Sequence, residues 1–295
     1  MRGAGNVTDH AIKDHDENIS DKDFCRLCGL IYQQSGINLN ADKKTMLELR
    51  IKRRVRALHL NSYVEYCEYL FGPEGQKDEI VHLLDVVSTN KTDFFREPDH
   101  FDFLSQKALP DLMSRNPSRR PLLIWSAGCS TGEEPYTLAI VLTEWARANP
   151  GFCFRVLATD ISNTVLAKAA RGVFPAEVVR PVGAALQKKY FMRSRDPDSK
   201  FMRVVPELRQ QVEFRRLNFM DADFGLAQKV DAFFCRNVII YFDRPTQERI
   251  MQKLSHQLLP GGYAFVGHSE TLHNMDLPLV PVAPSLYRKA EDARP

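Results

Sequence analysis

The hydrophobic pattern divides the chain into a helical first part and an alternating second part. Apolar residues recur at helical spacing in four early stretches, at residues 20–34, 42–58, 62–71 and 77–87. From residue 122 onward, short apolar runs alternate with helical stretches, which is typical of a parallel sheet covered by helices. The predicted strands are residues 122–125, 154–159, 212–217, 230–234 and 263–266, with a late strand near 285–288.

Capping and breaking residues set the limits of these parts. Ser20 with an acid at Asp23 predicts a helix start, and Gly36 predicts its end. Residues 1–19 have little apolar content and are interpreted as a disordered tail. We therefore predict a helical N-terminal domain at residues 20–87, a partly helical linker at 88–120 and an α/β domain at 121–290.

The interval between residues 159 and 212 is longer than one crossover helix needs. Within it, two short apolar runs at residues 191–193 and 201–205 flank a polar turn. This arrangement predicts a β-hairpin, so we expect a small β-subdomain, at about residues 174–209, inserted into the α/β domain.

Charge and composition exclude several classes of protein. The 40 Lys and Arg against 37 Asp and Glu give a net charge of +3, too small to require nucleic acid as a partner. The sequence lacks a long apolar window and an apolar signal-peptide core, so we expect a cytoplasmic protein without membrane insertion. The six scattered cysteines predict free thiols. Cys25 and Cys28 lack a second pair of zinc ligands, so no metal site is expected.

A glycine loop between a predicted strand and a predicted helix carries the most chemical information. The loop runs from Gly128 to Gly132, and Glu133 and Glu134 follow it at once. Dinucleotide loops have a different glycine spacing, and acids there would repel a pyrophosphate. S-adenosylmethionine has an ammonium group, a sulfonium and no phosphate, so Glu134 is a candidate partner for the ammonium. Glu133 is interpreted as complementing the helix dipole, a role that stays open for Glu134 as well.

Polar residues also follow the next predicted strands. Asp160 ends the second strand, where a carboxylate can bind ribose hydroxyls or cap the next helix. Asn218 and Phe219 end the third strand, near the expected position of an adenine. Arg236 and Asn237 end the fourth. No pair of prolines follows Asn237, which argues against methyltransferases that act on amide or exocyclic nitrogens.

Four segments closely resemble the chemotaxis receptor methyltransferases, the CheR-type protein-glutamate O-methyltransferases. They are residues 89–97 (TNKTDFFRE), 130–136 (STGEEPY), 234–242 (FCRNVIIYF) and 267–270 (GHSE), and the likeness covers about residues 20–290. The resemblance implies a Rossmann-like class I methyltransferase sheet with an all-helical N-terminal domain and a small inserted β-subdomain. It also implies methyl transfer from S-adenosylmethionine to glutamate carboxylates of methyl-accepting chemotaxis receptors, with S-adenosylhomocysteine as product, in signal transduction.

The same resemblance assigns site residues. Arg96 and Tyr241 would border the methyl group as catalytic residues, whereas His268 is interpreted as structural. A glutamate substrate has an unperturbed pKa of about 4.3 and is already ionised at neutral pH, so no general base is required. The residues expected to contact the cofactor are Asn90, Thr92, Arg96, Glu134, Asp160, Asn218, Phe219, Arg236 and Asn237.

The expected partners are the acidic cytoplasmic helices of chemotaxis receptors, with recruitment to membrane receptor arrays. The second predicted helix is basic, and although a solvated face is the usual explanation, the resemblance favours substrate docking. Some relatives bind a pentapeptide from the receptor C-terminus at the β-subdomain, but the turn at 194–200 lacks the glycines of those relatives. Alternatives are an RNA or small-molecule methyltransferase and a non-catalytic adenosyl-binding sensor. The docking residues are Lys43, Lys44, Arg50, Arg53, Arg54 and Arg56.

Overall fold

The computed structural model describes residues 18–196 and 198–291 and separates into two compact units, Met1–Ser88 and Thr89–Pro295. The predicted disordered tail lies outside the described residues except for Asn18 and Ile19. Ile19 is buried, and its backbone N–H donates to Oε1 of Glu48 at 3.0 Å. Ile19 therefore belongs to the core of the first unit and not to a tail.

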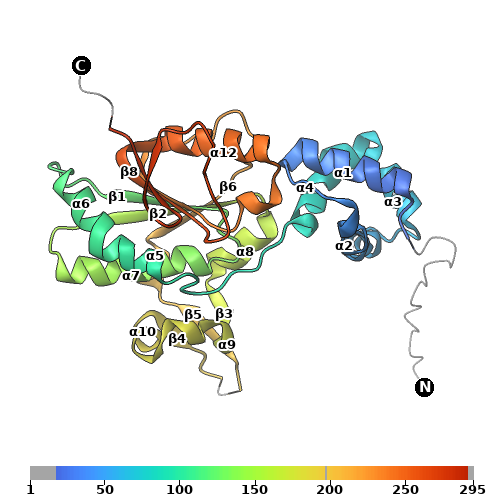
Figure 1. Ribbon diagram of the computed structural model, residues 1–295. Coiled ribbons are helices and arrows are strands. Elements are labelled where there is room, and N and C mark those ends of the chain that lie inside the picture. The colour runs from blue at the N-terminus through green and yellow to red at the C-terminus, as the bar shows by residue number, and fades with distance from the viewer. Residues whose placement is uncertain (1–17, 197, 292–295) are drawn as a thin grey trace. The chain divides into compact units, whose positions relative to one another are not determined.

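From residue 18 onward, the first unit contains four α-helices and a short 3₁₀ turn (Figure 1). Ser20 caps the first helix by accepting the Asp23 N–H, and Gly36 ends it with a φ of 75°, as the sequence predicted. Leu27, Ile31 and Ile51 are fully buried in the core of this unit. The elements are α1 (Asp21–Ser35), η1 (Ala41–Lys43), α2 (Lys44–Ala57), α3 (Tyr63–Phe71) and α4 (Pro73–Val87).

Helix α4 begins four residues before the predicted start at Lys77. Pro73 occupies the first helical turn, where its missing N–H would have no partner in any case. Gly75 lies so close to α3 that an added Cβ would be 2.1 Å from the carbonyl oxygen of Tyr69. The glycine therefore reflects close packing between α3 and α4 and not a loop.

The second unit is built on a seven-stranded sheet with the order β6-β2-β1-β7-β8-β10-β9. Five strands are parallel, and the last two are antiparallel to their neighbours. The strands are β1 (Leu122–Ala127), β2 (Phe154–Asp160), β6 (Val212–Arg216), β7 (Val230–Cys235), β8 (Leu258–Val266), β10 (Leu286–Lys289) and β9 (Leu279–Ala283). The sequence predicted six of the seven. It missed β9, an edge strand interrupted by Pro281, because proline inside an apolar run argues against a strand.

Helices cover both faces of this sheet, with α12 (Arg244–Gln257) on one side and α7 (Glu133–Ala148) on the other (Figure 1). Helix α8 (Asn163–Arg171) connects β2 to the inserted segment. In the core, the rings of Phe234 and Phe265 on neighbouring strands stack with centroids 4.0 Å apart. None of the helices in the described part of the chain is long and apolar enough to cross a membrane.

The interpretation of residues 88–120 as a linker needs correction, because from Thr89 they belong to the second unit. They contain α5 (Asp99–Phe103), the π-helical turn η2 (Leu104–Ala108) and α6 (Leu109–Ser114). Phe101, Leu104 and Leu109 are buried in the main core. Pro110 has no N–H for a helical hydrogen bond and is the second residue of α6, just beyond the π turn.

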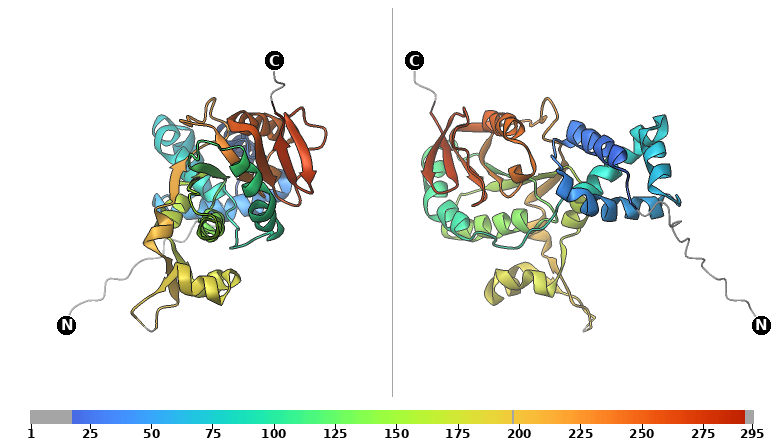
Figure 2. Two further views of the ribbon diagram at one scale, coloured as in Figure 1. Left: turned by 90° about the vertical axis from the view of Figure 1, so that its left-hand side faces the viewer. Right: turned by 45° about the vertical axis from the view of Figure 1, so that its right-hand side comes forward.

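The inserted segment forms a three-stranded antiparallel sheet with the order β3-β5-β4. Phe191 pairs with Val204, which confirms the predicted hairpin, and β3 adds a strand that the sequence did not predict. Figure 2 shows this subdomain projecting from the main sheet. Phe94 anchors it, with its ring edge-to-face against Phe174 at 5.0 Å and Phe191 at 5.6 Å. The elements are β3 (Val173–Pro175), α9 (Ala176–Val179), η3 (Arg180–Val182), α10 (Ala184–Tyr190), β4 (Phe191–Arg193), β5 (Phe201–Val204) and α11 (Pro206–Arg209).

Candidate active site

Parallel strands deliver the predicted cofactor residues to one edge of the main sheet. Strand β1 lies between β2 and β7, so the chain leaves β1 for one side and later returns on the other. Ligands of open parallel sheets bind at such a switch point, beyond the carboxyl ends of the strands. Asp160 is the last residue of β2, and Arg236 directly follows β7. The glycine loop follows β1 at the same edge.

Hydrogen bonds tie the glycine loop to the end of β2. The N–H groups of Gly128 and Cys129 donate to the carbonyl of Thr159 at 2.8 and 2.9 Å. The N–H of Ser130 donates to Oδ2 of Asp160 at 2.9 Å. Gly132 has a φ of 102°, in the left-handed region that favours glycine. The loop conformation and the orientation of the Asp160 carboxylate therefore depend on each other.

Arg236 is the centre of a buried charged network. Its side chain is only 2% exposed and lies between Glu134 and Glu97. Nη1 donates to Oε2 of Glu134 at 3.2 Å, and Nη2 donates to Oε2 of Glu97 at 3.0 Å and to the carbonyl of Arg96. Ser126 Oγ donates to the other oxygen of Glu134 at 2.6 Å. The network links β1, β7, the start of α7 and the segment that contains Arg96 and Glu97.

Burial and the charge of Arg236 shift the pKa values of Glu134 and Glu97 in opposite directions. Burial raises the pKa of Glu134, and the opposing effects of the Arg236 charge and the Ser126 hydrogen bond do not offset it. Burial also acts to raise the pKa of Glu97, but the charge and hydrogen bonds of Arg236 outweigh it and hold that pKa below its usual range. Glu134 is thus a largely buried acid that a further cation would stabilise in its ionised form.

Glu270 organises the loop after β7, a role that the sequence did not predict. Its carboxylate accepts four backbone N–H groups, from Gly267 at 2.6 Å and from Asn237, Val238 and Ile239 at 2.8 Å each. This holds Asn237 at a φ of 58°, a left-handed conformation that is uncommon for residues other than glycine. The only signal in the sequence was the position of Glu270 at the end of the matching segment 267–270.

The N-terminal segment of the second unit also reaches this edge. The carbonyl of Asn90 accepts a hydrogen bond from Ser130 Oγ of the glycine loop at 2.8 Å. Thr92 and Arg96 are half-buried, and Arg96 Nη1 donates to the carbonyl of Lys91 at 3.2 Å. Asn237 Nδ2 lies 3.4 Å from Oε1 of Glu97. The segment therefore contacts the glycine loop as well as the loop after β7.

The remaining predicted residues lie on short loops at the ends of strands. Asn218 Oδ1 accepts the N–H of Met220 at 3.0 Å in a tight turn after β6. The ring of Phe219 packs edge-to-face with that of Phe224 at 6.1 Å. Tyr241 is half-buried at the end of η4 (Ile239–Tyr241), in the loop that Glu270 holds.

Within the first unit, half of the predicted docking residues are engaged in intramolecular contacts. Arg54 forms two hydrogen bonds of 2.8 Å with the buried carboxylate of Glu79. Arg50 donates to the carbonyls at the end of α4, and Lys44 pairs with Asp21 at 2.6 Å. The exposed members of the predicted set are Lys43, Arg53 and Arg56.

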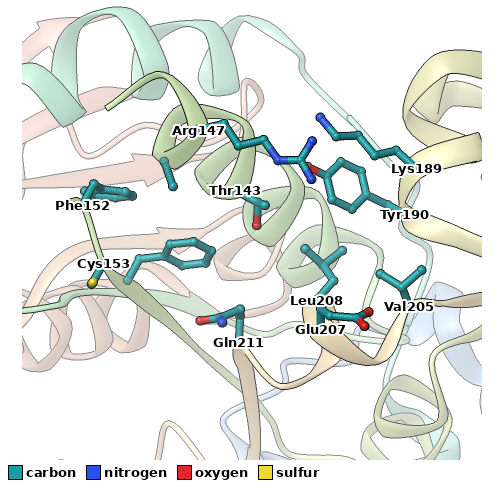
Figure 3. Close-up of a pocket in the computed structure, with 12 residues that line it drawn as sticks. Thr143, Arg147, Phe152, Cys153, Lys189, Tyr190, Val205, Glu207, Leu208 and Gln211 are labelled. Atoms are coloured by element: carbon teal, nitrogen blue, oxygen red, sulfur yellow. The ribbon is translucent and has the colours of Figure 1, made fainter. Parts of the chain in front are cut away.

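A cavity of about 500 Å³ elsewhere in the second unit is not part of this edge (Figure 3). Phe154 lines it and begins β2, whereas Asp160 ends that strand, so the two places are roughly 20 Å apart along the strand. Figure 3 shows Arg147, Lys189 and Tyr190 close together at the cavity. Lys189 pairs with Glu144 at 2.5 Å, and Arg147 lies 3.7 Å from the same carboxylate oxygen.

Known proteins resemble the chain over both units. Residues 22–88 match the family CheR methyltransferase, all-alpha domain, and residues 90–282 match CheR methyltransferase, SAM binding domain. The chain is 42% identical over 249 residues to chemotaxis protein methyltransferase 2 of Pseudomonas aeruginosa, covering 84% of this chain and 86% of the relative. It is 38% identical over 276 residues to chemotaxis protein methyltransferase of Borreliella burgdorferi, covering 92% and 95%. The Escherichia coli protein of that name is 35% identical over 274 residues, covering 93% of each.

The fold and the site define a class I methyltransferase that uses S-adenosylmethionine. The carboxylates of Glu134 and Asp160 suit a ligand that has an ammonium group, ribose hydroxyls and no phosphate, so the chemistry of the site fits this molecule. The chain belongs to the CheR methyltransferase family, which confirms the predicted resemblance, fold class, enzyme class and methyl donor.

Proposed function

We propose that this methyltransferase esterifies glutamate side chains of chemotaxis receptors for sensory adaptation. The observation that carries the proposal is the extent of the likeness. Relatives named chemotaxis protein methyltransferases match the helical unit as well as the methyltransferase unit. A general likeness between methyltransferases would involve the Rossmann-like sheet and not the helical unit.

In this proposal, acids at the carboxyl edge bind the methyl donor, which supplies an electrophilic methyl group when bound. Glu134 binds the ammonium, and its raised pKa supports this role because a buried, incompletely compensated carboxyl group favours a cationic ligand. Asp160 binds the ribose hydroxyls, and Arg236 positions Glu134 through their 3.2 Å hydrogen bond. The other proposed contacts come from Asn90, Thr92, Arg96, Asn218, Phe219 and Asn237.

The acceptor glutamate is ionised at neutral pH, so the protein has to orient it and need not deprotonate it. We assign the orientation to Arg96 and Tyr241, through hydrogen bonds to the acceptor carboxylate. Arg96→Ala and Tyr241→Phe are expected to slow single-turnover methyl transfer at saturating donor. Unchanged single-turnover rates in both variants would refute this assignment.

Substrate docking is assigned to the exposed basic face of α2. Lys43, Arg53 and Arg56 are exposed, and Leu49 on the same helix is 63% exposed. Such a face complements the acidic helices of receptors and would recruit the enzyme to receptor arrays at the membrane. Peptide tethering stays outside the proposal, because the turn at 194–200 lacks the glycines of tethering relatives.

The test is transfer of labelled methyl from S-adenosylmethionine to receptor-rich membranes, followed by mild alkali, which releases methanol from esters. Alkali-labile label on receptor glutamates is expected with the native chain and much less with Glu134→Gln at a donor concentration below the native Kd. Label on RNA or a small molecule would favour those substrates. Donor binding without transfer to receptors would favour an adenosyl-binding sensor.

A further inference from the structure

Three side chains beside the Arg236 network lie close together, and the mechanism proposed above does not use them as a group. Glu97, His100 and His268 each present a ligand atom, and these atoms all lie within 4.8 Å of one another. Nδ1 of His100 is 3.6 Å from Oε2 of Glu97. Two ligands at about 2.1 Å from a tetrahedral zinc ion are roughly 3.4 Å apart, so this pair already has nearly the required spacing.

The contacts around His100 show which ring nitrogen is already engaged. Ser285 Oγ donates to the carbonyl of Pro284 at 2.7 Å and lies 2.9 Å from Nε2 of His100. Nε2 is therefore engaged by Ser285, and Nδ1 is the ring nitrogen that is left for a further ligand. The His100 side chain is fully buried, and Nδ1 has no hydrogen-bond partner among the residues that the structure describes.

Nδ1 of His100 faces Oε2 of Glu97 at 3.6 Å in a largely buried place. A buried nitrogen without a hydrogen-bond partner is unfavourable unless a ligand reaches it. A metal ion between the two atoms would coordinate both of them.

We propose that Glu97, His100 and His268 bind a divalent transition metal ion of the Zn²⁺ class. Imidazole nitrogens and a carboxylate are ligands that suit zinc and its neighbours in the first transition series. His268 is about half exposed, so an ion can enter from solvent on its side. Asp99 lies 3.1 Å from Nε2 of His268 and adds a second negative charge.

The sequence did not predict this site, because its ligands are far apart along the chain. Glu97 and His100 precede the main sheet, and His268 follows β8. The sequence analysis expected no metal site because Cys25 and Cys28, which have metal-like spacing, lack a second pair of ligands. These two cysteines are in the first unit and not in this cluster.

The first experiment measures Zn²⁺ binding to the full-length protein by calorimetry, and Co²⁺ binding by its visible absorption. His268→Ala is expected to weaken one binding event by at least about tenfold, since even the loss of a residue that only supports a metal ligand costs 10- to 100-fold. His273→Ala is the matched control, because His273 is an exposed histidine outside the cluster. His10 and His15 and all six cysteines remain in both variants, so the comparison isolates the cluster.

Either result of this comparison decides the proposal. Equal Zn²⁺ affinity in His268→Ala and His273→Ala would overturn it, as would Co²⁺ spectra that show only thiolate ligands. Long-range ¹H–¹⁵N spectra of the histidine rings provide a readout that needs no variant. Zn²⁺ is expected to shift the Nδ1 resonance of His100, and an Nδ1 that stays protonated at saturating Zn²⁺ would overturn the proposal.

A second arm tests whether the site affects the cofactor crevice, and this arm rests on the cofactor residues of the proposed function. A metal bound to Glu97 draws its charge away from Arg236, which then pairs more strongly with Glu134. Saturating Zn²⁺ should therefore weaken S-adenosylhomocysteine binding by about fivefold or more in the wild type and not in His268→Ala. Equal affinities with and without Zn²⁺ would refute the coupling while leaving the binding result intact.

Discussion

Glu133 and Glu134 are neighbours in the sequence, but their side chains have different surroundings. Glu133 accepts a hydrogen bond from Thr131 Oγ1 at 2.6 Å in the first turn of α7. Glu134 points to the carboxyl edge of the sheet and pairs with Ser126 and Arg236. The sequence predicted different roles for these two acids, but it could not identify Arg236 as the partner of Glu134, because that contact joins the start of α7 to the end of β7 through the fold.

Glu134→Gln is expected to weaken S-adenosylmethionine binding by about 2 kcal/mol or more, roughly 30-fold, because it removes one charge from the ion pair that the proposed function assigns to Glu134 and the ammonium. Glu133→Gln is the matched control and should change the affinity much less. Equilibrium dialysis or calorimetry measures both. Similar affinities in the two variants would place the ammonium elsewhere.

Glu270 leads to a second prediction about a single residue. In Glu270→Gln the side-chain amide group must face two of the four N–H donors that the carboxylate now accepts. Two unsatisfied buried N–H groups should lower the free energy of unfolding by about 2 kcal/mol or more. Glu248→Gln is the control, since Glu248 accepts one exposed N–H, from Asp276 at 3.0 Å. Urea unfolding compares them, and an equal loss would contradict the role of Glu270.

At the scale of elements, local signals predicted helices and strands well where the chain is regular. The α1 cap, the five parallel strands and the β4–β5 hairpin all follow from patterns a few residues long. The helical character of residues 88–120 was predicted, but their place in the second unit was not, because the burial of Phe101 and Leu104 in the main core is a tertiary contact. The start of α4 was misplaced for a similar reason, because the packing of Gly75 against α3 is also a tertiary contact.

The packing of α3 and α4 can be tested with two glycines in helices of the first unit. Gly75→Ala should destabilise this unit by about 1–3 kcal/mol, since the new Cβ would meet the backbone of Tyr69. Gly29→Ala in α1 should stabilise it by up to about 1 kcal/mol, because a Cβ there meets no atom within 4 Å and alanine favours helix. Thermal unfolding measures both changes in stability. Changes of the same sign in the two variants would contradict the close packing of α3 and α4.

At the scale of the whole molecule, the nearly balanced net charge of +3 hides a local basic face on α2. Arg53→Glu with Arg56→Glu is expected to raise the KM for receptor by about tenfold at low salt and to leave S-adenosylmethionine affinity unchanged. The effect should shrink as salt rises, because exposed charges are screened beyond a Debye length of about 10 Å at 0.1 M. The control is Lys107→Glu with Lys229→Glu, which changes the net charge by the same amount at two exposed lysines outside α2. An equal rise in KM for the control would argue against docking on α2.

The sequence by itself determined the fold class, the family and the edge of the sheet where the chemistry lies. It could do so because helix caps, strand periodicity and the glycine loop each depend on neighbours within a few residues. Tertiary structure alone decided which side chains meet. Arg236 reaches Glu97, Glu270 accepts N–H groups of the loop after β7, and His268 approaches His100 only when distant segments pack together. Local propensities carry no information about contacts between such distant segments, so the charged network and the proposed metal site became visible only in the folded protein.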